Sequence, residues 1–345
     1  MKLIIRADSN KTVAMGHVMR CLSIADAVRD AGGEVVFVTA SNDPEALITA
    51  RGYRCIVMDT DFADTFGELP KLKAVIGKER PDVILFDGYY FKNEYFKALE
   101  GMAKLVFVDD YGKWAFPVDM VVNYNIYGED LDYEGVYAGE GKALPKLLRG
   151  TVYAPLRREF LNAAPVKIKE GTLKVLVSTG GADLCRVALS LCERLLADRP
   201  ENISLGVLVG PFSQDRDAIK RLSAENPDFI RVYENITDMS GFLSRFDMAL
   251  SAAGSTSYEL CRMGIPTCLF CTADNQSLIN ETFKKKGITE SAGNAERDKN
   301  AVLDRLVVFI KEYTDAGKRA SMAEKMRAAV DARGAERIAS EIFKI

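Results

Sequence analysis

Residues 3–22, LIIRADSNKTVAMGHVMRCL, contain the pattern that decides the fold. The apolar run at 3–7 is typical of a buried strand, and a polar loop follows it. From Gly16 onward, Val18, Cys21 and Leu22 recur at helical spacing. A strand, a loop and a helix in this order predict a parallel α/β unit, because parallel strands need a crossover connection.

The same alternation continues along the whole chain. Further strands are predicted at 35–39, 55–58, 83–86, 105–108, 120–123, 173–177, 205–209, 230–233, 248–251 and 267–270. Most of these runs are apolar throughout, as expected when helices cover both faces of a parallel sheet. A polar stretch at 128–146 interrupts the rhythm. We therefore expect two doubly wound, Rossmann-like domains facing a cleft, with domains at 1–160 and 166–335 and a C-terminal helix at 336–345.

The composition excludes several classes of protein. The 345 residues include 46 Lys and Arg against 49 Asp and Glu, so the net charge of −3 favours neither nucleic acid nor an anionic membrane. No apolar run approaches the roughly 20 residues of a membrane span, and Arg6 interrupts the first apolar stretch, unlike a signal peptide. The seven cysteines form no CxxC pair, which indicates reduced thiols and a cytoplasmic protein. The oligomeric state is not predicted.

His17 is the single histidine of the chain. A His-rich metal site is therefore excluded, and we expect no metal and no cofactor. The residue follows a strand and a loop and opens a helix, where positive potential disfavours the imidazolium form. A neutral imidazole can take a proton from water, so the hypothesis is a general base. The alternative is a helix-capping or packed histidine.

The segment at 251–259 is a second candidate. Gly254, Ser255 and Thr256 follow a predicted strand and begin a helix, a place where main-chain N–H groups and hydroxyls bind phosphate. Glu259, one turn later, could accept hydrogen bonds from a ribose. The alternative is an ordinary helix N-terminus with Ser, Thr and Glu in capping positions.

Polar residues end other predicted strands. Gly180 and Gly181 form a glycine turn, and Asn275 with Gln276 supplies amides suited to sugar hydroxyls or acetamido groups. Asp87 and Tyr89 close a strand in the first half and could line a sugar pocket, as could the residues at 109–111 and 123–125. Each of these segments could equally be an ordinary turn.

Taken together, these motifs resemble the PseG family. Those enzymes are UDP-2,4-diacetamido-2,4,6-trideoxy-β-L-altropyranose hydrolases of pseudaminic acid biosynthesis, similar in fold to the GT-B glycosyltransferase MurG. The residues that carry the resemblance run over nearly the whole chain and are Arg6-x-Asp8, Gly16-His17-x-x-Arg20, Gly180-Gly181-Ala182-Asp183, Gly254-Ser255-Thr256-x-x-Glu259, Asn275-Gln276 and Tyr153-x-x-Leu156-Arg157-x-Glu159-Phe160.

The resemblance implies a site. His17 would activate water without a metal, so that UDP leaves with inversion at the anomeric carbon. The sugar would contact the N-terminal domain, and UDP would bind the C-terminal domain, with its uracil near Ile236. By position, the implied substrate-binding residues are Arg6, Asp8, Gly16, Arg20, Asp87, Tyr89, Asn275 and Gln276, and the implied UDP-binding residues are Gly180, Gly181, Ile236, Gly254, Ser255, Thr256 and Glu259.

The chain departs from the family pattern at Ala14, where a glycine is usual, and at the bulky Met15. It also resembles SpsG-type spore coat polysaccharide proteins. A GT-B glycosyltransferase of cell-surface polysaccharide or spore coat synthesis is the main alternative, and it would present an apolar or basic patch to its acceptor. No such patch is evident in the sequence of the N-terminal half, which favours water as the acceptor. A hydrolysing 2-epimerase and a nucleotide-sugar binding protein complete the alternatives.

Overall fold

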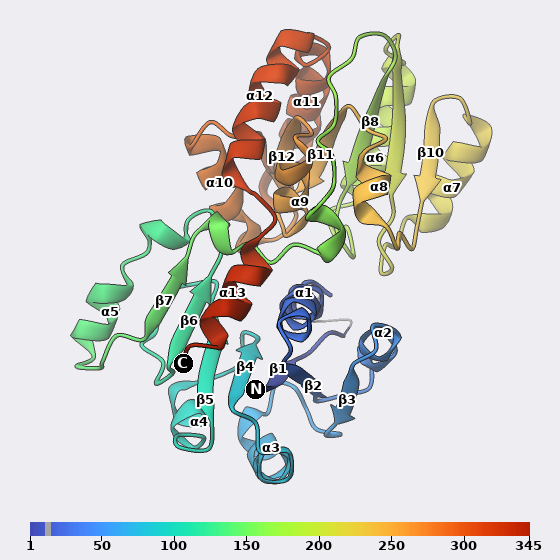
Figure 1. Ribbon diagram of the computed structural model, residues 1–345. Coiled ribbons are helices and arrows are strands. Elements are labelled where there is room, and N and C mark those ends of the chain that lie inside the picture. Colours follow the sequence, from blue (N-terminus) through green and yellow to red (C-terminus); the bar gives the residue numbers. More distant parts are fainter. Residues whose placement is uncertain (11–14) are drawn as a thin grey trace. The chain divides into compact units, whose positions relative to one another are not determined.

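The computed structural model describes residues 1–10 and 15–345, which form two compact units (Figure 1). Unit 1 comprises Met1–Arg158 and Ala332–Ile345, and unit 2 comprises Glu159–Asp331. The C-terminal helix α13 (Gly334–Ile342) therefore belongs to unit 1, where it packs against α1 (Gly16–Asp30). It begins at Gly334, two residues before the predicted 336, and ends before the last three residues.

Unit 1 is a parallel sheet in the order β3-β2-β1-β4-β5-β6-β7. Its strands are β1 (Lys2–Ala7), β2 (Glu34–Thr39), β3 (Arg54–Val57), β4 (Val83–Asp87), β5 (Lys104–Val108), β6 (Met120–Asn123) and β7 (Lys146–Arg149). The other helices of this unit are α2 (Glu45–Ala50), α3 (Thr65–Glu79), α4 (Asn93–Lys97) and α5 (Tyr133–Gly139), with short 3-10 turns at Gly128–Asp130, Thr151–Tyr153 and Arg158–Phe160.

Unit 2 is a second parallel sheet, in the order β10-β9-β8-β11-β12-β13. Its strands are β8 (Leu173–Ser178), β9 (Ile203–Leu208), β10 (Ile230–Tyr233), β11 (Met248–Ala252), β12 (Thr267–Cys271) and β13 (Glu290–Asn294). Its helices are α6 (Val187–Asp198), α7 (Arg216–Glu225), α8 (Met239–Leu243), α9 (Thr256–Met263), α10 (Ser277–Lys285), α11 (Ala295–Glu312) and α12 (Ala316–Ala329), with a 3-10 turn η4 at Asp274–Gln276.

The predicted fold class is confirmed, and the missed strands have a common cause. β7 and β13 each lie at one edge of their sheet, and their sequences KLLR and ESAGN carry polar residues that break an apolar run. β7 lies at the end of the stretch 128–146, which also contains α5. An edge strand is partly open to solvent, so its position permits such polar residues. It does not require them, because the other two edge strands, β3 and β10, are predicted from the sequence at 55–58 and 230–233.

Each sheet has one point at which the strand order reverses. In unit 1 the chain passes from β1 to β2 on one side and later returns to β4 on the other side of β1. In unit 2, β8 is followed by β9 on one side and by β11 on the other. Loops diverge at such a point, and open α/β sheets bind their ligands there, beyond the carboxyl ends of the strands. The segments that follow β1, β4, β8 and β11 are therefore the first places to look for a site.

The described helices include none with the length and apolar character needed to cross a bilayer.

Candidate active site

His17 lies at the reversal point of unit 1, in the first turn of α1. Its Nδ1 is 2.6 Å from Oδ1 of Asp87, the last residue of β4. Both side chains are buried, with His17 7% and Asp87 2% exposed. His17 does not cap its helix, because the N-cap residue is Met15 and no side-chain capping bond is present. The structure therefore does not support the capping role for the imidazole.

Arg20, one turn after His17, holds the other side of the Asp87 carboxylate. Its Nε donates to Oδ2 and its Nη2 donates to Oδ1, each at 2.6 Å. Burial by itself raises the pKa of the Asp87 carboxyl, but the positive charge of Arg20 and the contact with His17 outweigh it, so the pKa lies well below its usual range. Asp87 is consequently a carboxylate at neutral pH.

The ionisation of Asp87 determines the tautomer of His17. A carboxylate can only accept hydrogen bonds, so Nδ1 of the imidazole must carry the proton that lies between it and Oδ1. In the neutral ring this leaves the lone pair on Nε2. Within residues 1–10 and 15–345, no group is hydrogen-bonded to Nε2. The imidazole is thus oriented with its proton-accepting nitrogen available.

A second carboxylate, Asp110 after β5, completes the cluster around Arg20. Its oxygens accept from Nη1 and Nη2 of Arg20, each at 3.1 Å, and from the Tyr89 hydroxyl at 3.0 Å. Asn125, after β6, donates to Asp110 at 2.8 Å, and the Tyr124 hydroxyl accepts from Arg20 at 2.9 Å. The ends of three neighbouring strands therefore converge on one guanidinium group.

The cluster around Arg20 contains more carboxylates than guanidinium groups. Two buried carboxylates, Asp87 and Asp110, face the single positive charge of Arg20. The positive charge of Arg20 also keeps the pKa of Asp110 low against the effect of its burial.

Arg6 and Asp8 belong to a separate cluster. Arg6 is fully buried, and its Nε and Nη2 donate to the buried Glu68 while Nη1 donates to Asp8. The other oxygen of Asp8 accepts from the main-chain N–H of Ala40, and Glu68 accepts from the Tyr95 hydroxyl. Arg6 and Asp8 thus fix the end of β1, where the loop leading to Gly16 begins. Ala14, one of the two departures from the family pattern, lies outside the described residues.

In unit 2, the predicted glycine turn follows β8 at the reversal point. Gly180 has φ +79°, a left-handed conformation that favours glycine, and the carbonyl of Gly181 accepts from the main-chain N–H of Phe212. Asp183 is buried and accepts from the N–H groups of Val187 and Ala188, so it caps α6. The last residue of this motif therefore has a structural role.

The second predicted segment of unit 2 follows β11 on the other side of the same point. Gly254 lies in the turn, Ser255 is the N-cap residue of α9, and Thr256 is its first residue. The hydroxyl of Ser255 makes no side-chain capping bond to the helix. Glu259 lies in the first turn of α9 and is 5% exposed. These residues share one loop and one helix end, as the sequence indicated.

The remaining predicted residues lie at other strand ends of unit 2. Asn275 is exposed in η4 after β12, while Oε1 of Gln276 accepts from the main-chain N–H of Thr272 at 2.8 Å. Ile236 is half-buried in the loop between β10 and α8. Because all strands of the sheet are parallel, these loops share its carboxyl edge with Gly180, Gly181 and Gly254.

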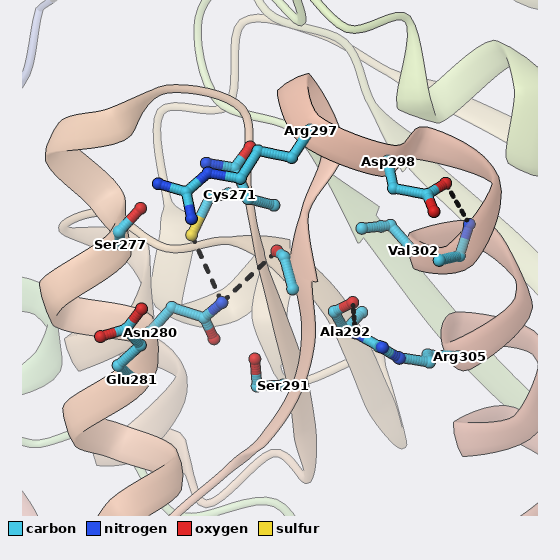
Figure 2. A pocket seen from close by; sticks show the side chains of 13 residues that line it. Cys271, Ser277, Asn280, Glu281, Ser291, Ala292, Arg297, Asp298, Val302 and Arg305 are labelled. Carbon is cyan, nitrogen blue, oxygen red and sulfur yellow. Dashed lines mark hydrogen bonds between the residues drawn. The ribbon is translucent and has the colours of Figure 1, made fainter.

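Unit 2 also contains a cavity of about 290 Å³ between α10, β13 and α11 (Figure 2). It includes none of the residues predicted from the sequence. Arg297 and Arg305 line it together with Glu281 and Asp298, so its charges are mixed and give no preference for a diphosphate. Across residues 1–10 and 15–345, no group of three or more His, Cys, Asp or Glu side chains is arranged to hold a metal ion.

Three sequence relatives match most of the chain. An uncharacterized protein of Methanocaldococcus jannaschii is 28% identical over 83% of this chain, which spans only 59% of that protein's length. SpsG of Bacillus subtilis, a spore coat polysaccharide biosynthesis protein, is 25% identical, with coverages of 86% and 85%. The UDP-N-acetylglucosamine–N-acetylmuramyl-(pentapeptide) pyrophosphoryl-undecaprenol N-acetylglucosamine transferase of Crocosphaera subtropica is 24% identical, with coverages of 79% and 80%. No family model matches the chain.

Solved structures share the fold over the whole chain. MurG of Acinetobacter baumannii superposes with a TM-score of 0.68 at 15% identity, covering 100% of this chain and 99% of MurG. MnaA of S. aureus, solved with UDP, superposes with a TM-score of 0.66 at 14% identity, with coverages of 99% and 95%. The chain therefore has the GT-B fold of MurG-like glycosyltransferases, and its sequence relatives include a spore coat polysaccharide biosynthesis protein.

Proposed function

We propose that this chain is an enzyme that transfers a sugar from UDP to an incoming hydroxyl group, with His17 as the general base. The observation that carries the proposal is the 2.6 Å contact between His17 Nδ1 and the Asp87 carboxylate at the reversal point of unit 1. This contact orients the ring and leaves Nε2 as the proton acceptor, which is the arrangement that general-base catalysis requires.

The reaction needs one base and a good leaving group. The hydroxyl oxygen attacks the anomeric carbon of the UDP-sugar, and its proton passes to Nε2 of His17. The bond between the anomeric carbon and the diphosphate oxygen breaks, and its electron pair leaves with UDP. A single displacement of this kind inverts the anomeric configuration. Because UDP leaves readily once its charge is stabilised, the second carboxylic acid used by most glycosidases is not required.

Unit 2 would bind the nucleotide. Gly180, Gly181 and Gly254 offer main-chain N–H groups at the carboxyl edge of the sheet, and Ser255 and Thr256 add hydroxyls at the start of α9, a suitable environment for a diphosphate. By the family resemblance, Glu259 would bind the ribose and Ile236 would contact the uracil. Asn275 and Gln276 would contact the sugar.

The relatives favour a carbohydrate acceptor. MurG-like transferases share the fold over the whole chain, one sequence relative is an N-acetylglucosamine transferase, and SpsG is assigned to polysaccharide synthesis. We therefore propose glycosyl transfer in cell-surface or spore coat polysaccharide synthesis as the main function. On this proposal Gly16, Arg20, Asp87 and Tyr89 shape the site around His17, and Arg6 with Asp8 positions the preceding loop.

Hydrolysis is the second candidate, and the motifs that resemble the PseG family favour it. Water would then replace the acceptor hydroxyl at the same base. The substrate would be UDP-2,4-diacetamido-2,4,6-trideoxy-β-L-altropyranose, an intermediate of pseudaminic acid and flagellin glycosylation, and the products would be UDP and the inverted free sugar. The two candidates share His17, Asp87 and the nucleotide site, and they differ in the hydroxyl that attacks and in the sugar that is released.

The decisive experiment follows UDP release and the anomeric product by proton NMR. The donors are UDP-N-acetylglucosamine and UDP-2,4-diacetamido-2,4,6-trideoxy-β-L-altropyranose, each supplied with and without a saccharide acceptor. With the donor that is turned over, His17→Ala is expected to lower the rate about 10²–10⁴-fold, the usual contribution of a general base. Arg29→Ala, at the far end of α1, is the matched control and should leave the rate unchanged.

UDP affinity, measured by calorimetry, should be the same in His17→Ala as in the wild type, because the nucleotide site lies on other residues. Release of UDP only in the presence of acceptor would support the transferase, and release in water alone would support the hydrolase. A His17→Ala protein that keeps its full rate would refute the proposed mechanism.

A further inference from the structure

Aromatic side chains form a row that begins at His17 and runs outward over unit 1. The Tyr89 ring meets the His17 ring edge to face, with 4.7 Å between centroids. Tyr111 follows at 5.4 Å from Tyr89, and Trp114 at 6.1 Å from Tyr111. Tyr89 is 45% and Trp114 48% exposed, while Tyr111 is half-buried. This aromatic row corrects the expectation that the N-terminal half presents no apolar patch.

The aromatic row is anchored at both ends. Trp114 lies 6.1 Å from Phe116, a buried member of the unit 1 core, and the Tyr89 hydroxyl donates to Asp110. Between these ends the loop after β5 is held by Asp109, whose oxygens accept from the N–H groups of Tyr111 and Gly112 at 2.8 Å each. The rings are therefore positioned before any ligand binds.

Gly112 makes this loop possible. Its φ of +62° is left-handed, and a Cβ at this position would come within 2.9 Å of the Leu131 side chain. The tight turn brings Tyr111 and Trp114 onto the same side as Tyr89. The side-chain nitrogen of Lys113 lies 5.6 Å from the centre of the Tyr111 ring, so the row also carries a positive charge.

We propose that Tyr111 and Trp114 bind a pyranose ring of a saccharide acceptor and direct one of its hydroxyls toward His17. This inference rests on the proposed function and identifies its acceptor as a carbohydrate. A pyranose has an apolar face of C–H groups, which packs on the negative face of an aromatic ring, while its hydroxyls stay at the rim. Because the row starts at the His17 ring, a saccharide that lies along it would bring a hydroxyl next to this residue.

The length and composition of the row favour this occupant. One ring, Tyr89, would be enough to pack against the sugar that is being transferred, and water as the acceptor would need no further ring. Tyr111 and Trp114 extend the surface by two more rings, which fits a second sugar. The exposed members are aromatic with polar tips, and Lys113 and Asp110 flank them, whereas a lipid-facing patch would be built of aliphatic and clustered basic side chains.

Trp114 is the only tryptophan in the chain, so its fluorescence reports directly on ligand binding at the aromatic row. The probes are N-acetylglucosamine and N,N′-diacetylchitobiose, titrated without any donor. We expect a saturable change in Trp114 emission, with the disaccharide bound more tightly than the monosaccharide. Tyr111→Ala keeps the tryptophan and should weaken disaccharide binding about threefold to tenfold, the contribution of one aromatic contact.

Two controls separate this inference from the proposed function. Phe66→Ala removes from α3 an aromatic ring that is 48% exposed, as Trp114 is, and it should leave the saccharide titration unchanged. His17→Ala should lower turnover about 10²–10⁴-fold but leave saccharide binding unchanged, because Tyr111 and Trp114 are still present. In turnover assays, Trp114→Ala should raise the acceptor KM more than it lowers kcat.

Three outcomes would overturn the inference. The first is an emission that no saccharide changes, and the second is equal binding by Tyr111→Ala and the wild type. The third is an emission that responds to anionic phosphatidylglycerol vesicles but not to saccharides, which would assign the row to a membrane surface. If saccharides bind but no donor is turned over, the proposed function is wrong, whereas saccharide binding by Tyr111 and Trp114 is confirmed.

Discussion

The two units carry their candidate residues at equivalent places in equivalent sheets, yet the residues differ in kind. At the reversal point of unit 1 stand His17, Asp87 and Arg20, charged or ionisable groups that are nearly fully buried and bonded to one another. At the reversal point of unit 2 stand glycines and hydroxyls such as Gly180, Gly254 and Ser255.

This difference indicates a division of labour. A base must be held in one orientation and one tautomer, which buried ion pairs achieve at a cost in desolvation. A diphosphate is bound well by main-chain N–H groups and small side chains, which leave room for the ligand and need no fixed charge. We therefore expect substitutions in unit 1 to affect stability and catalysis strongly, and substitutions in unit 2 to affect nucleotide affinity more mildly.

The largest effect is expected for Arg20→Ala. It leaves the Asp87 and Asp110 carboxylates buried without their counter-charge, and breaking a buried ion pair in this way typically costs about 3–5 kcal/mol. The free energy of unfolding, measured by urea denaturation, should fall by that amount.

The control is Arg158→Ala, which removes an exposed ion pair with Asp30. Exposed pairs contribute at most about 1 kcal/mol, so its effect should be small. Equal losses in the two variants would contradict the idea that the cluster around His17 depends on buried charge.

The pH dependence of stability is the next test. The pKa values of Asp87 and Asp110 are lowered in the folded state, so below the unfolded value of about 3.9 the unfolded chain binds protons that the folded chain does not. These groups contribute their full stabilisation above that pH, and it is lost as pH falls through their folded pKa values. Each group lowers the free energy of unfolding by up to about 1.4 kcal/mol for each pH unit below that value.

Urea denaturation at a series of acidic pH values measures how the free energy of unfolding depends on pH. Asp87→Asn should weaken this dependence on pH, whereas the control Asp43→Asn, at an exposed position, should not alter it. If Asp87→Asn has the same dependence on pH as the wild type, the ionised form of this buried carboxylate does not stabilise the fold.

Glu259→Ala in unit 2 should weaken UDP binding without changing the tautomer or orientation of His17. A hydrogen bond to a charged group contributes about 1.5–3 kcal/mol, so the Kd for UDP should rise on the order of tenfold to a hundredfold. Calorimetry with UDP measures this change, and Glu225→Ala, at the end of α7, is the control. Unchanged affinity in Glu259→Ala would place the ribose elsewhere.

The smallest effects are expected for Ser255→Ala and Thr256→Val. Each removes one hydroxyl from the start of α9 and leaves the main-chain N–H groups in place. A neutral hydrogen bond contributes about 0.5–1.5 kcal/mol, so UDP affinity should fall only about twofold to tenfold in each variant. A larger loss would mean that the hydroxyls, and not the main chain, carry the diphosphate.

The sequence allowed much of the fold to be predicted, because central strands of a parallel sheet are apolar on both faces and stand out between amphipathic helices. Strands β7 and β13 were missed, since polar residues break their apolar runs. Nothing in the sequence signals Glu68 either. It is one glutamate in a charged helix, and only the fold shows that it is fully buried against Arg6.

The sequence by itself determined the parallel α/β class and the positions of His17, Asp87 and the glycine turns at strand ends, because periodicity and turn composition are local properties. Only the tertiary structure decided which groups face one another. Asp87 is 70 residues from His17 and Asp110 is 90 residues from Arg20, and no local pattern encodes such pairings. The strand order brought β1, β4 and β5 together, and with them the base, its carboxylate and the aromatic row beside it.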